Sequence, residues 1–185
     1  MSIRHLHDRF TIDSHSYICQ PYHINGGMAS LHVGKYTAIA INLRVDLGYQ
    51  HNYKNVTSFP MHILKEGVPS NLWCKGDIHV LNDCWIGENV TLMGGVTIGN
   101  GAIIGANTTV RRDVLPYEIY IGGDYSYYQK GLRPTTDQSK KFRFDEKTRE
   151  RLLELAWWDW EESRILANAE LLAQPDIERF LNEHI

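Results

Sequence analysis

The stretch from Val80 to Val110, VLNDCWIGENVTLMGGVTIGNGAIIGANTTV, repeats one pattern every six residues. Each sixth position is aliphatic: Val80, Ile86, Leu92, Ile98, Ile104 and Val110. A period of six matches neither the 3.6-residue period of an amphipathic helix nor the alternation of a plain strand. It fits short strands joined by tight corners, in which stacked coils bury a continuous column of aliphatic side chains. The sequence therefore predicts a mainly β protein built as a parallel β-helix, with an ordinary sheet of accidental spacing as the alternative.

The same pattern occurs upstream, in phase, at Val33, Ile39 and Val45. Glycine follows three of the downstream aliphatics, at Gly87, Gly99 and Gly105, and we expect it to ease the turns there. Six consecutive matches and three more upstream favour the coil over accidental spacing.

An insertion interrupts the repeat between Val45 and Val80, because their separation of 35 residues is not a multiple of six. It runs from about residue 47 to residue 76. Long excursions from a rigid scaffold are usually functional or disordered. The insertion is rich in aromatic residues, which favours an ordered, functional loop. These aromatics are Tyr49, Tyr53, Phe59 and Trp73.

The C-terminal third indicates helices. Asp145 is a suitable N-cap, and Leu152, Leu155, Ala156 and Trp160 recur at helical spacing on one face. A break at residues 174–176 precedes a last short helix whose inward residues are Ile177, Phe180 and Leu181. We expect the tryptophans of this region to pack against the end of the coil. The chain is read as one domain, with the β-helix over 1–117 and a connector and helical cap over 118–185.

Composition excludes several classes of protein. Hydrophobic residues make up 43% and charged residues 22% of the chain, and the net charge is -3, which gives no footprint for nucleic acid or an anionic membrane. No apolar run reaches the roughly 18 residues of a spanning helix. Three unspaced cysteines, Cys19, Cys74 and Cys84, fit a reducing cytoplasm. The histidines have no metal-ligand spacing, so we expect no metal site.

With these features, the chain resembles the hexapeptide-repeat xenobiotic acetyltransferases, the group that contains streptogramin and chloramphenicol acetyltransferases. Three segments carry the resemblance: VGKYTAIAINLRVDLGYQHNYKNVTSFP (33–60), KGDIHVLNDCWIGENVTLMGGVTIGNGAIIGANTTVRRDVLPY (75–117) and LLELAWWDWEE (152–162). The resemblance implies a left-handed coil, although the usual crossover rule favours the right-handed form. It also implies a homotrimer with active sites between subunits, and transfer of an acetyl group from acetyl-CoA to a hydroxyl of a small molecule, either an antibiotic or a saccharide.

His51, in the insertion, matches the catalytic histidine of this group. A histidine can act as general base on a hydroxyl and then return the proton to the departing CoA thiolate, so no covalent intermediate is needed. The resemblance places Trp85 beside the cysteamine arm of CoA, with Gly105 and Ala106 leaving room for pantetheine. Arg111, Arg112 and Lys130 are candidates for the nucleotide end. Tyr49, Tyr53, Phe59 and His62 are candidates for contact with the acceptor.

Two other functions stay open. One is N-acylation of an amino-sugar nucleotide, and the other is a non-catalytic β-helical binding or assembly protein. The segment GGDYSYYQKG (122–131) differs from the usual sequence of the family after the last coil. Stabilisation by CoA would separate the two enzymes from the non-catalytic protein, and the effect of removing His51 would separate the two enzymes.

Overall fold

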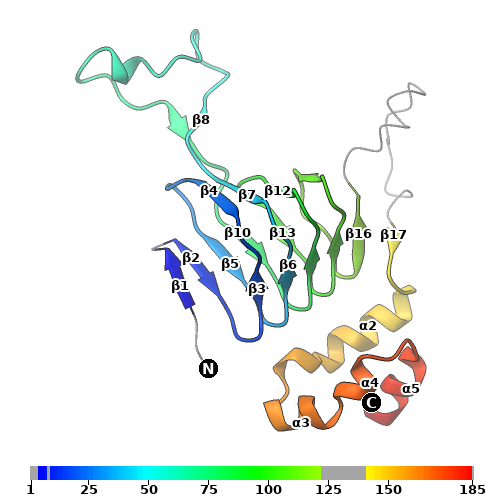
Figure 1. Ribbon diagram of the computed structural model, residues 1–185. Helices are drawn as coiled ribbons and strands as arrows, with labels where there is room; N and C mark the ends of the chain where they lie inside the picture. The colour runs from blue at the N-terminus through cyan, green and yellow to red at the C-terminus, as the bar shows by residue number, and fades with distance from the viewer. Residues whose placement is uncertain (1–3, 8, 122–140, 185) are drawn as a thin grey trace.

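A computed structural model describes residues 4–7, 9–121 and 141–184. The chain winds as a left-handed parallel β-helix, with one long excursion and a group of C-terminal helices (Figure 1). Each turn visits three sheets in the same order, and we call them sheets A, B and C. The parallel β-helix predicted from the repeat is confirmed, and so is the left hand that the family resemblance implied.

The strands of each sheet stack coil on coil. Sheet A has the order β1 (Arg4–His7), β2 (Phe10–Ile12), β5 (Leu31–Val33), β10 (Ile78–Val80) and β13 (Thr97–Ile98). Sheet B has the order β17 (Lys141–Phe142), β16 (Glu118–Tyr120), β14 (Ile103–Ile104), β11 (Trp85–Ile86), β6 (Ala38–Ile39) and β3 (Tyr17–Ile18). Sheet C has the order β15 (Thr109–Val110), β12 (Thr91–Leu92), β7 (Leu43–Leu47) and β4 (Tyr22–Gly26). All neighbours are parallel except β1 with β2 and β16 with β17.

The register of the sheets is the one that the six-residue period predicts. Val33 pairs with Val80, Ile39 with Ile86 and Val45 with Leu92. The next coil continues the same columns through Ile98, Ile104 and Val110. Each of these side chains is at most 3% exposed. Burial of these aliphatic columns is the main force that holds the coils together.

One coil was not recognised in the sequence. Ile12, Ile18 and Ile24 are also six residues apart, and they pair with Val33, Ile39 and Val45. The step from Ile24 to Val33 is nine residues, because extra residues around Gly26 widen that corner. At the N-terminal side, the pattern therefore predicts one coil fewer than the structure contains. At the other side β16 continues sheet B after Pro116, where the sequence had indicated an irregular connector.

The glycines that follow the aliphatics have a different role from the one expected. Gly87 and Gly99 do not have positive φ, so they do not ease a turn. Instead, a Cβ at Gly87 would lie 2.7 Å from Ala106 N, and a Cβ at Gly99 would lie 2.5 Å from Pro116 N. These glycines are required because the backbone of the next coil stacks directly against them. The positive-φ positions are elsewhere at the corners, where successive coils place Asn42, Asn89 and Asn107.

The insertion leaves the coil where sheet C turns into sheet A and projects away from it (Figure 1). It contains β8 (Gln50–His51), the short 3-10 helix η1 (Met61–Ile63) and β9 (Leu72–Trp73). Strands β8 and β9 form an antiparallel ribbon. The predicted excursion at 47–76 is therefore present.

The C-terminal helices are α2 (Glu146–Leu155), η3 (Trp157–Asp159), α3 (Glu162–Ala167), α4 (Ala169–Leu172) and α5 (Ile177–His184). Asp145 caps α2 as expected, since its carboxylate accepts the Thr148 N–H at 2.8 Å. The long helical face predicted through Trp160 is interrupted, because Ala156 adopts φ 42° and ends α2. In α5, Phe180 and Leu181 are buried as predicted.

These helices lie along the corner between sheets A and B rather than over the open end of the coil (Figure 1). Trp157 contacts Tyr36 with ring centroids 4.9 Å apart, and Asp159 accepts from Lys35 Nζ at 2.7 Å. Further along the same corner, Tyr117 packs with Leu152 in a second small core. The tryptophans were expected to cover the end of the coil, and this was wrong, because Trp157 packs against the corner between sheets A and B.

Candidate active site

His51 lies in β8, on the excursion, and its side chain is exposed. Its Nδ1 is 2.7 Å from the carbonyl oxygen of Ser58. A carbonyl oxygen can only accept a hydrogen bond, so this contact requires a proton on Nδ1. In the neutral ring the lone pair is then on Nε2, which is the atom that can accept a proton from a substrate. The loop therefore holds the ring in the tautomer of a general base.

The other loop candidates are displayed at the surface. The exposed fractions are 54% for Tyr49, 76% for Tyr53 and 46% for Phe59. His62 lies in η1 and is half-buried. All four belong to the same excursion as His51, so the insertion groups the predicted acceptor residues on one projecting element.

Trp85 lies on the outer face of sheet B, where 57% of its surface is exposed. It belongs to an outward row that crosses the five parallel strands of sheet B, and each member within those strands is apolar or aromatic; beyond them, Ile119 pairs with Lys141 of β17. The row consists of Tyr17, Ala38, Trp85, Ile103 and Ile119. From β3 to β16, the outer face of sheet B is therefore an apolar strip along the coil, and Lys141 lies at its end.

Gly105 and Ala106 follow the sheet B strand β14. A Cβ at Gly105 would be 3.4 Å from Ile121 Cγ1, which is an ordinary contact. Packing within the chain therefore does not demand glycine at position 105, whereas it does at Gly87 and Gly99. An open backbone at this position suits the close approach of a ligand.

The basic residues predicted to bind the nucleotide end of CoA differ in whether they are exposed or already paired with an acidic group. Arg111 is exposed beyond the end of β15. Arg112 instead binds Glu118, with Nη2 2.6 Å from Oε1 and Nη1 3.2 Å from Oε2, and its guanidinium lies 4.7 Å from the centre of the Tyr120 ring. The charge of Arg112 is thus neutralised within the chain. Lys130 lies outside the described residues.

A single chain does not bring His51 and Trp85 together. The excursion leaves at the corner between sheets C and A, and sheet B is the face of the triangular coil that does not touch that corner. The base and the apolar strip therefore point to different sides of the molecule.

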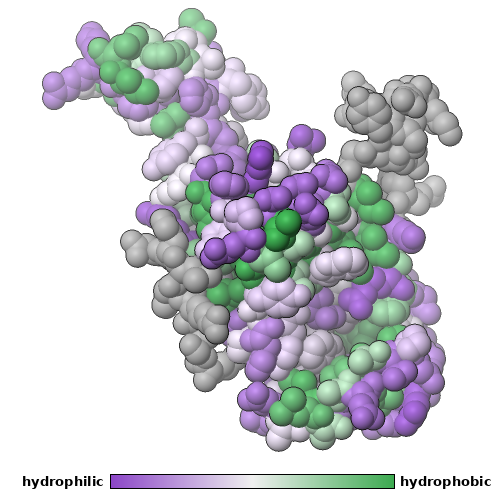
Figure 2. Space-filling model, viewed as in Figure 1, coloured by the Kyte–Doolittle hydropathy of each residue, from purple (hydrophilic) through white to green (hydrophobic). Residues whose placement is uncertain are grey.

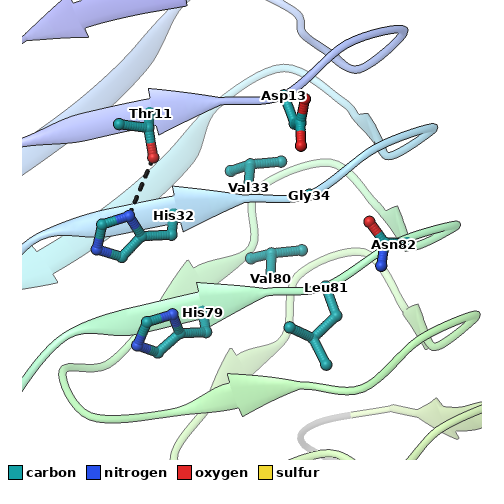
Figure 3. Close-up of a pocket in the computed structure, with 9 residues that line it drawn as sticks. All are labelled: Thr11, Asp13, His32, Val33, Gly34, His79, Val80, Leu81 and Asn82. Atoms are coloured by element: carbon teal, nitrogen blue, oxygen red, sulfur yellow. Dashed lines mark hydrogen bonds between the residues drawn. The ribbon is translucent and has the colours of Figure 1, made fainter. Parts of the chain in front are cut away.

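Sequence reasoning did not single out a shallow groove on the outer face of sheet A (Figure 3). The rings of His32 and His79 stack there with centroids 5.0 Å apart, and Thr11 Oγ1 is 3.0 Å from His32 Nδ1. The signal was present, since each histidine directly precedes a repeat valine. No group of three or more potential metal ligands gathers anywhere in the described part of the chain.

Cys84 is an inward residue of the coil rather than a nucleophile. Burial raises the pKa of its thiol to about 12, so the thiolate that a nucleophile needs is not formed near neutral pH. Across residues 4–7, 9–121 and 141–184, no helix combines the length and the apolar character that a membrane crossing requires.

Comparison with known proteins gives consistent matches. Residues 77–112 match the family model described as bacterial transferase hexapeptide (six repeats). A protein of Lysinibacillus sphaericus named "Probable macrolide acetyltransferase" is 37% identical over 160 residues, which cover 82% of each chain. A chloramphenicol acetyltransferase of Agrobacterium fabrum is 28% identical over 158 residues, which cover 82% of this chain and 70% of the relative.

Among solved structures, AntD, an N-acyltransferase from Bacillus cereus in complex with coenzyme A, superposes with a TM-score of 0.53. It is 20% identical, and the match covers 80% of this chain and 70% of that protein. At this identity the likeness supports the coil architecture alone.

Proposed function

Because the chain belongs to the hexapeptide-repeat xenobiotic acetyltransferases, we propose that it transfers an acetyl group from acetyl-CoA to a hydroxyl of a small molecule, with His51 as the general base. The observation that carries the role of His51 is the hydrogen bond from its Nδ1 to the Ser58 carbonyl, which leaves Nε2 as the proton acceptor.

The chemistry needs only one proton carrier. His51 Nε2 takes the proton of the acceptor hydroxyl while the oxygen attacks the thioester carbonyl. The protonated ring then gives the same proton to the sulfur of CoA as the C–S bond breaks. Because the acceptor oxygen attacks the thioester directly, the enzyme forms no covalent intermediate, and the proton that is removed is returned within one turnover. A positioned base of this kind typically contributes about 10²–10⁴ in rate.

Sheet B and its end would take the acetyl donor. Trp85 offers an apolar wall for the pantetheine arm, and Gly105 and Ala106 offer open backbone. Exposed Arg111 is the described cation best suited to a phosphate, because Arg112 is already paired with Glu118. Lys130 stays a candidate from the sequence.

The proposed site is shared between subunits of a homotrimer. The base and the apolar strip of sheet B diverge in one chain, so a second copy must bring them together. A loop that contacts a different surface of its neighbour makes a head-to-tail contact, and three such contacts close a ring.

The surface of the loop supports this arrangement. Seven exposed apolar or aromatic side chains project from the excursion, and Figure 2 shows hydrophobic residues at its surface. They are Tyr49, Tyr53, Val56, Phe59, Met61, Ile63 and Leu64. Four buried polar atoms of the excursion also lack a hydrogen-bond partner within the described chain: Gln50 Oε1, His62 Nδ1, Asn71 Oδ1 and Trp73 Nε1. A large exposed apolar surface is typical of an interaction site.

The same side chains favour an apolar acceptor. Tyr49, Tyr53 and Phe59 would contact a large, partly apolar antibiotic over more of its surface than a simple sugar. Together with the macrolide acetyltransferase relative, this favours a hydroxylated antibiotic over a saccharide. A cytoplasmic location suits the function because the free thiols of the described chain fit a reducing compartment.

The test of the base is His51→Ala, assayed by thiol release from acetyl-CoA against macrolides, streptogramin A, chloramphenicol and simple hexoses. We expect a loss of about 10²–10⁴ in kcat with the best acceptor. Thermal stabilisation by CoA should be retained. His23→Ala is the matched control, because His23 is exposed on sheet C. Retention of activity in His51→Ala within a few-fold would refute the base, and a preference for simple hexoses over the antibiotics would refute the acceptor class.

The shared site has its own test. His51→Ala and Trp85→Ala chains should each be nearly inactive, but co-expressed chains should regain activity, since mixed trimers contain some sites with both native residues. Sedimentation should show a trimer. A fully active monomer, or mixed chains without recovery, would contradict the arrangement.

A further inference from the structure

The strand that carries His51 is held by few contacts. β8 pairs with β9 through Gln50 with Trp73 and through His51 with Leu72. A two-stranded ribbon of this length is not stable alone in water. The position of the imidazole must therefore be set by contacts that join β8 to the rigid coil.

Asp46 makes such a contact. It lies in β7, within sheet C, where it pairs with Asn25 of the preceding coil. Its Oδ2 accepts a hydrogen bond from Gln50 Nε2 at 2.7 Å, and its Oδ1 accepts from Gly48 N at 3.3 Å. Gln50 directly precedes His51. One carboxylate thus connects the coil to the neighbour of the catalytic residue.

The backbone between Asp46 and Gln50 is unusual. Gly48 has φ 126° and Tyr49 has φ 66°, so both lie in the region that L-residues rarely adopt. A Cβ at Gly48 would lie 2.8 Å from Met28 Cβ and 3.0 Å from Cys74 Cβ. Such a conformation persists only where neighbouring groups hold it. The bond from Gly48 N to Asp46 holds this turn from inside.

The orientation of the Gln50 side-chain amide also indicates that its hydrogen bond to Asp46 is strong. With Nε2 on the carboxylate, Gln50 Oε1 is buried without a hydrogen-bond partner among the described residues. The opposite orientation would place two acceptor oxygens against each other. A hydrogen bond to an ionised carboxylate is roughly twice as strong as a neutral one, so the bond to Asp46 decides this orientation of the amide.

We propose that Asp46 and Gln50 are positioning residues that fix where the His51 ring lies relative to the coil. The proposal rests on the proposed function of His51. It adds that a carboxylate of the scaffold, which touches no substrate, determines how productively the base is placed. A misplacement of about 1 Å far from the reacting atoms can cost about 10²-fold in rate.

The test compares Asp46→Ala and Gln50→Ala with the parent enzyme. We expect kcat to fall about ten- to a hundredfold in each variant, while KM for acetyl-CoA stays within about twofold. The matched control is Asp77→Ala. The Asp77 carboxylate accepts the Ser30 N–H at 2.8 Å near the other end of the excursion but does not bond β8, so kcat should be unchanged. If Asp46→Ala fails to fold, Gln50→Ala decides alone, because it removes the same bond from the loop side.

Double variants separate positioning from a general structural effect. Asp46→Ala with Gln50→Ala should be no slower than the slower single variant, because the two residues act through one contact. In a His51→Ala background, Asp46→Ala should cause no further loss. Strictly additive losses, a further loss without His51, or single variants within twofold of the parent would each overturn the proposal.

An error in the role of His51 and an error in the role of Asp46 and Gln50 give different results. If His51→Ala keeps its activity, the base itself is wrong. If His51→Ala is inactive while Asp46→Ala and Gln50→Ala are fully active, only the positioning role is wrong.

Discussion

Replacing Arg112 by alanine should destabilise the last coil rather than weaken the binding of acetyl-CoA. The side chain of Glu118 is 2% exposed and accepts three hydrogen bonds. Two come from Arg112, at 2.6 and 3.2 Å, and one comes from Leu115 N at 2.9 Å. Arg112→Ala removes two of the three bonds and the compensating charge.

The magnitude follows from the burial of the two partners. Removing one partner of a buried ion pair typically costs about 3–5 kcal/mol. The Arg112 side chain is 45% exposed, so water reaches this edge, and we expect the lower end of that range, about 3 kcal/mol. For a chain of this length the melting temperature should fall by about 6–12 °C.

The assay is thermal and urea denaturation at one fixed protein concentration, with KM for acetyl-CoA measured on the same preparations. Arg111→Ala is the control, since this neighbouring arginine is exposed and its removal should change stability by less than about 0.5 kcal/mol. Adding Glu118→Gln to Arg112→Ala should recover part of the loss, because the amide oxygen can still accept from Leu115 N without a buried charge. Unchanged stability together with a raised KM would show that Arg112 binds the cofactor phosphates and that the structural reading is wrong.

Three further outcomes are expected. Gly99→Ala should destabilise the fold by about 1–3 kcal/mol in urea denaturation, because the new Cβ would lie 2.5 Å from the backbone nitrogen of Pro116. Gly105→Ala should leave stability unchanged and raise KM for acetyl-CoA, because its Cβ would make only ordinary contacts within the chain. With a thiol reagent at pH 8, Cys84 should react only after unfolding, since burial raises its pKa to about 12; rapid labelling of the folded protein at Cys84 would contradict this. The Thr148 N–H lowers the pKa of the Asp145 carboxyl, so the cap stabilises α2 fully above the ordinary pKa of about 4 and loses its effect as the pH falls through the lowered value. The difference in stability between the parent and Asp145→Ala should therefore become smaller at acidic pH. A difference that stays constant with pH would exclude a charged cap.

The sequence was enough to predict the candidate base, but the groups that hold it in place could be identified only from contacts in the structure. His51 stood out because it lies in the interruption of a regular repeat. The partner of its Nδ1, the Ser58 carbonyl, is a backbone atom and leaves no trace in residue identity. The contact between Asp46 and Gln50 could not be predicted from the sequence, because it depends on a turn at Gly48 whose backbone angles the pattern does not reveal.

The sequence by itself determined the coil and its register, because the six-residue period is a local property that every strand repeats. The spacing of Val80, Ile86 and Leu92 predicts the aliphatic columns that are buried inside the coil. Only the tertiary structure decided the rest. The extra coil was hidden by a nine-residue step, and Arg112 changed from a ligand candidate to the partner of Glu118. The divergence of His51 and Trp85 depends on which corner of the triangle the excursion leaves, and such relations between distant parts of the chain are fixed by stacking rather than by any local pattern.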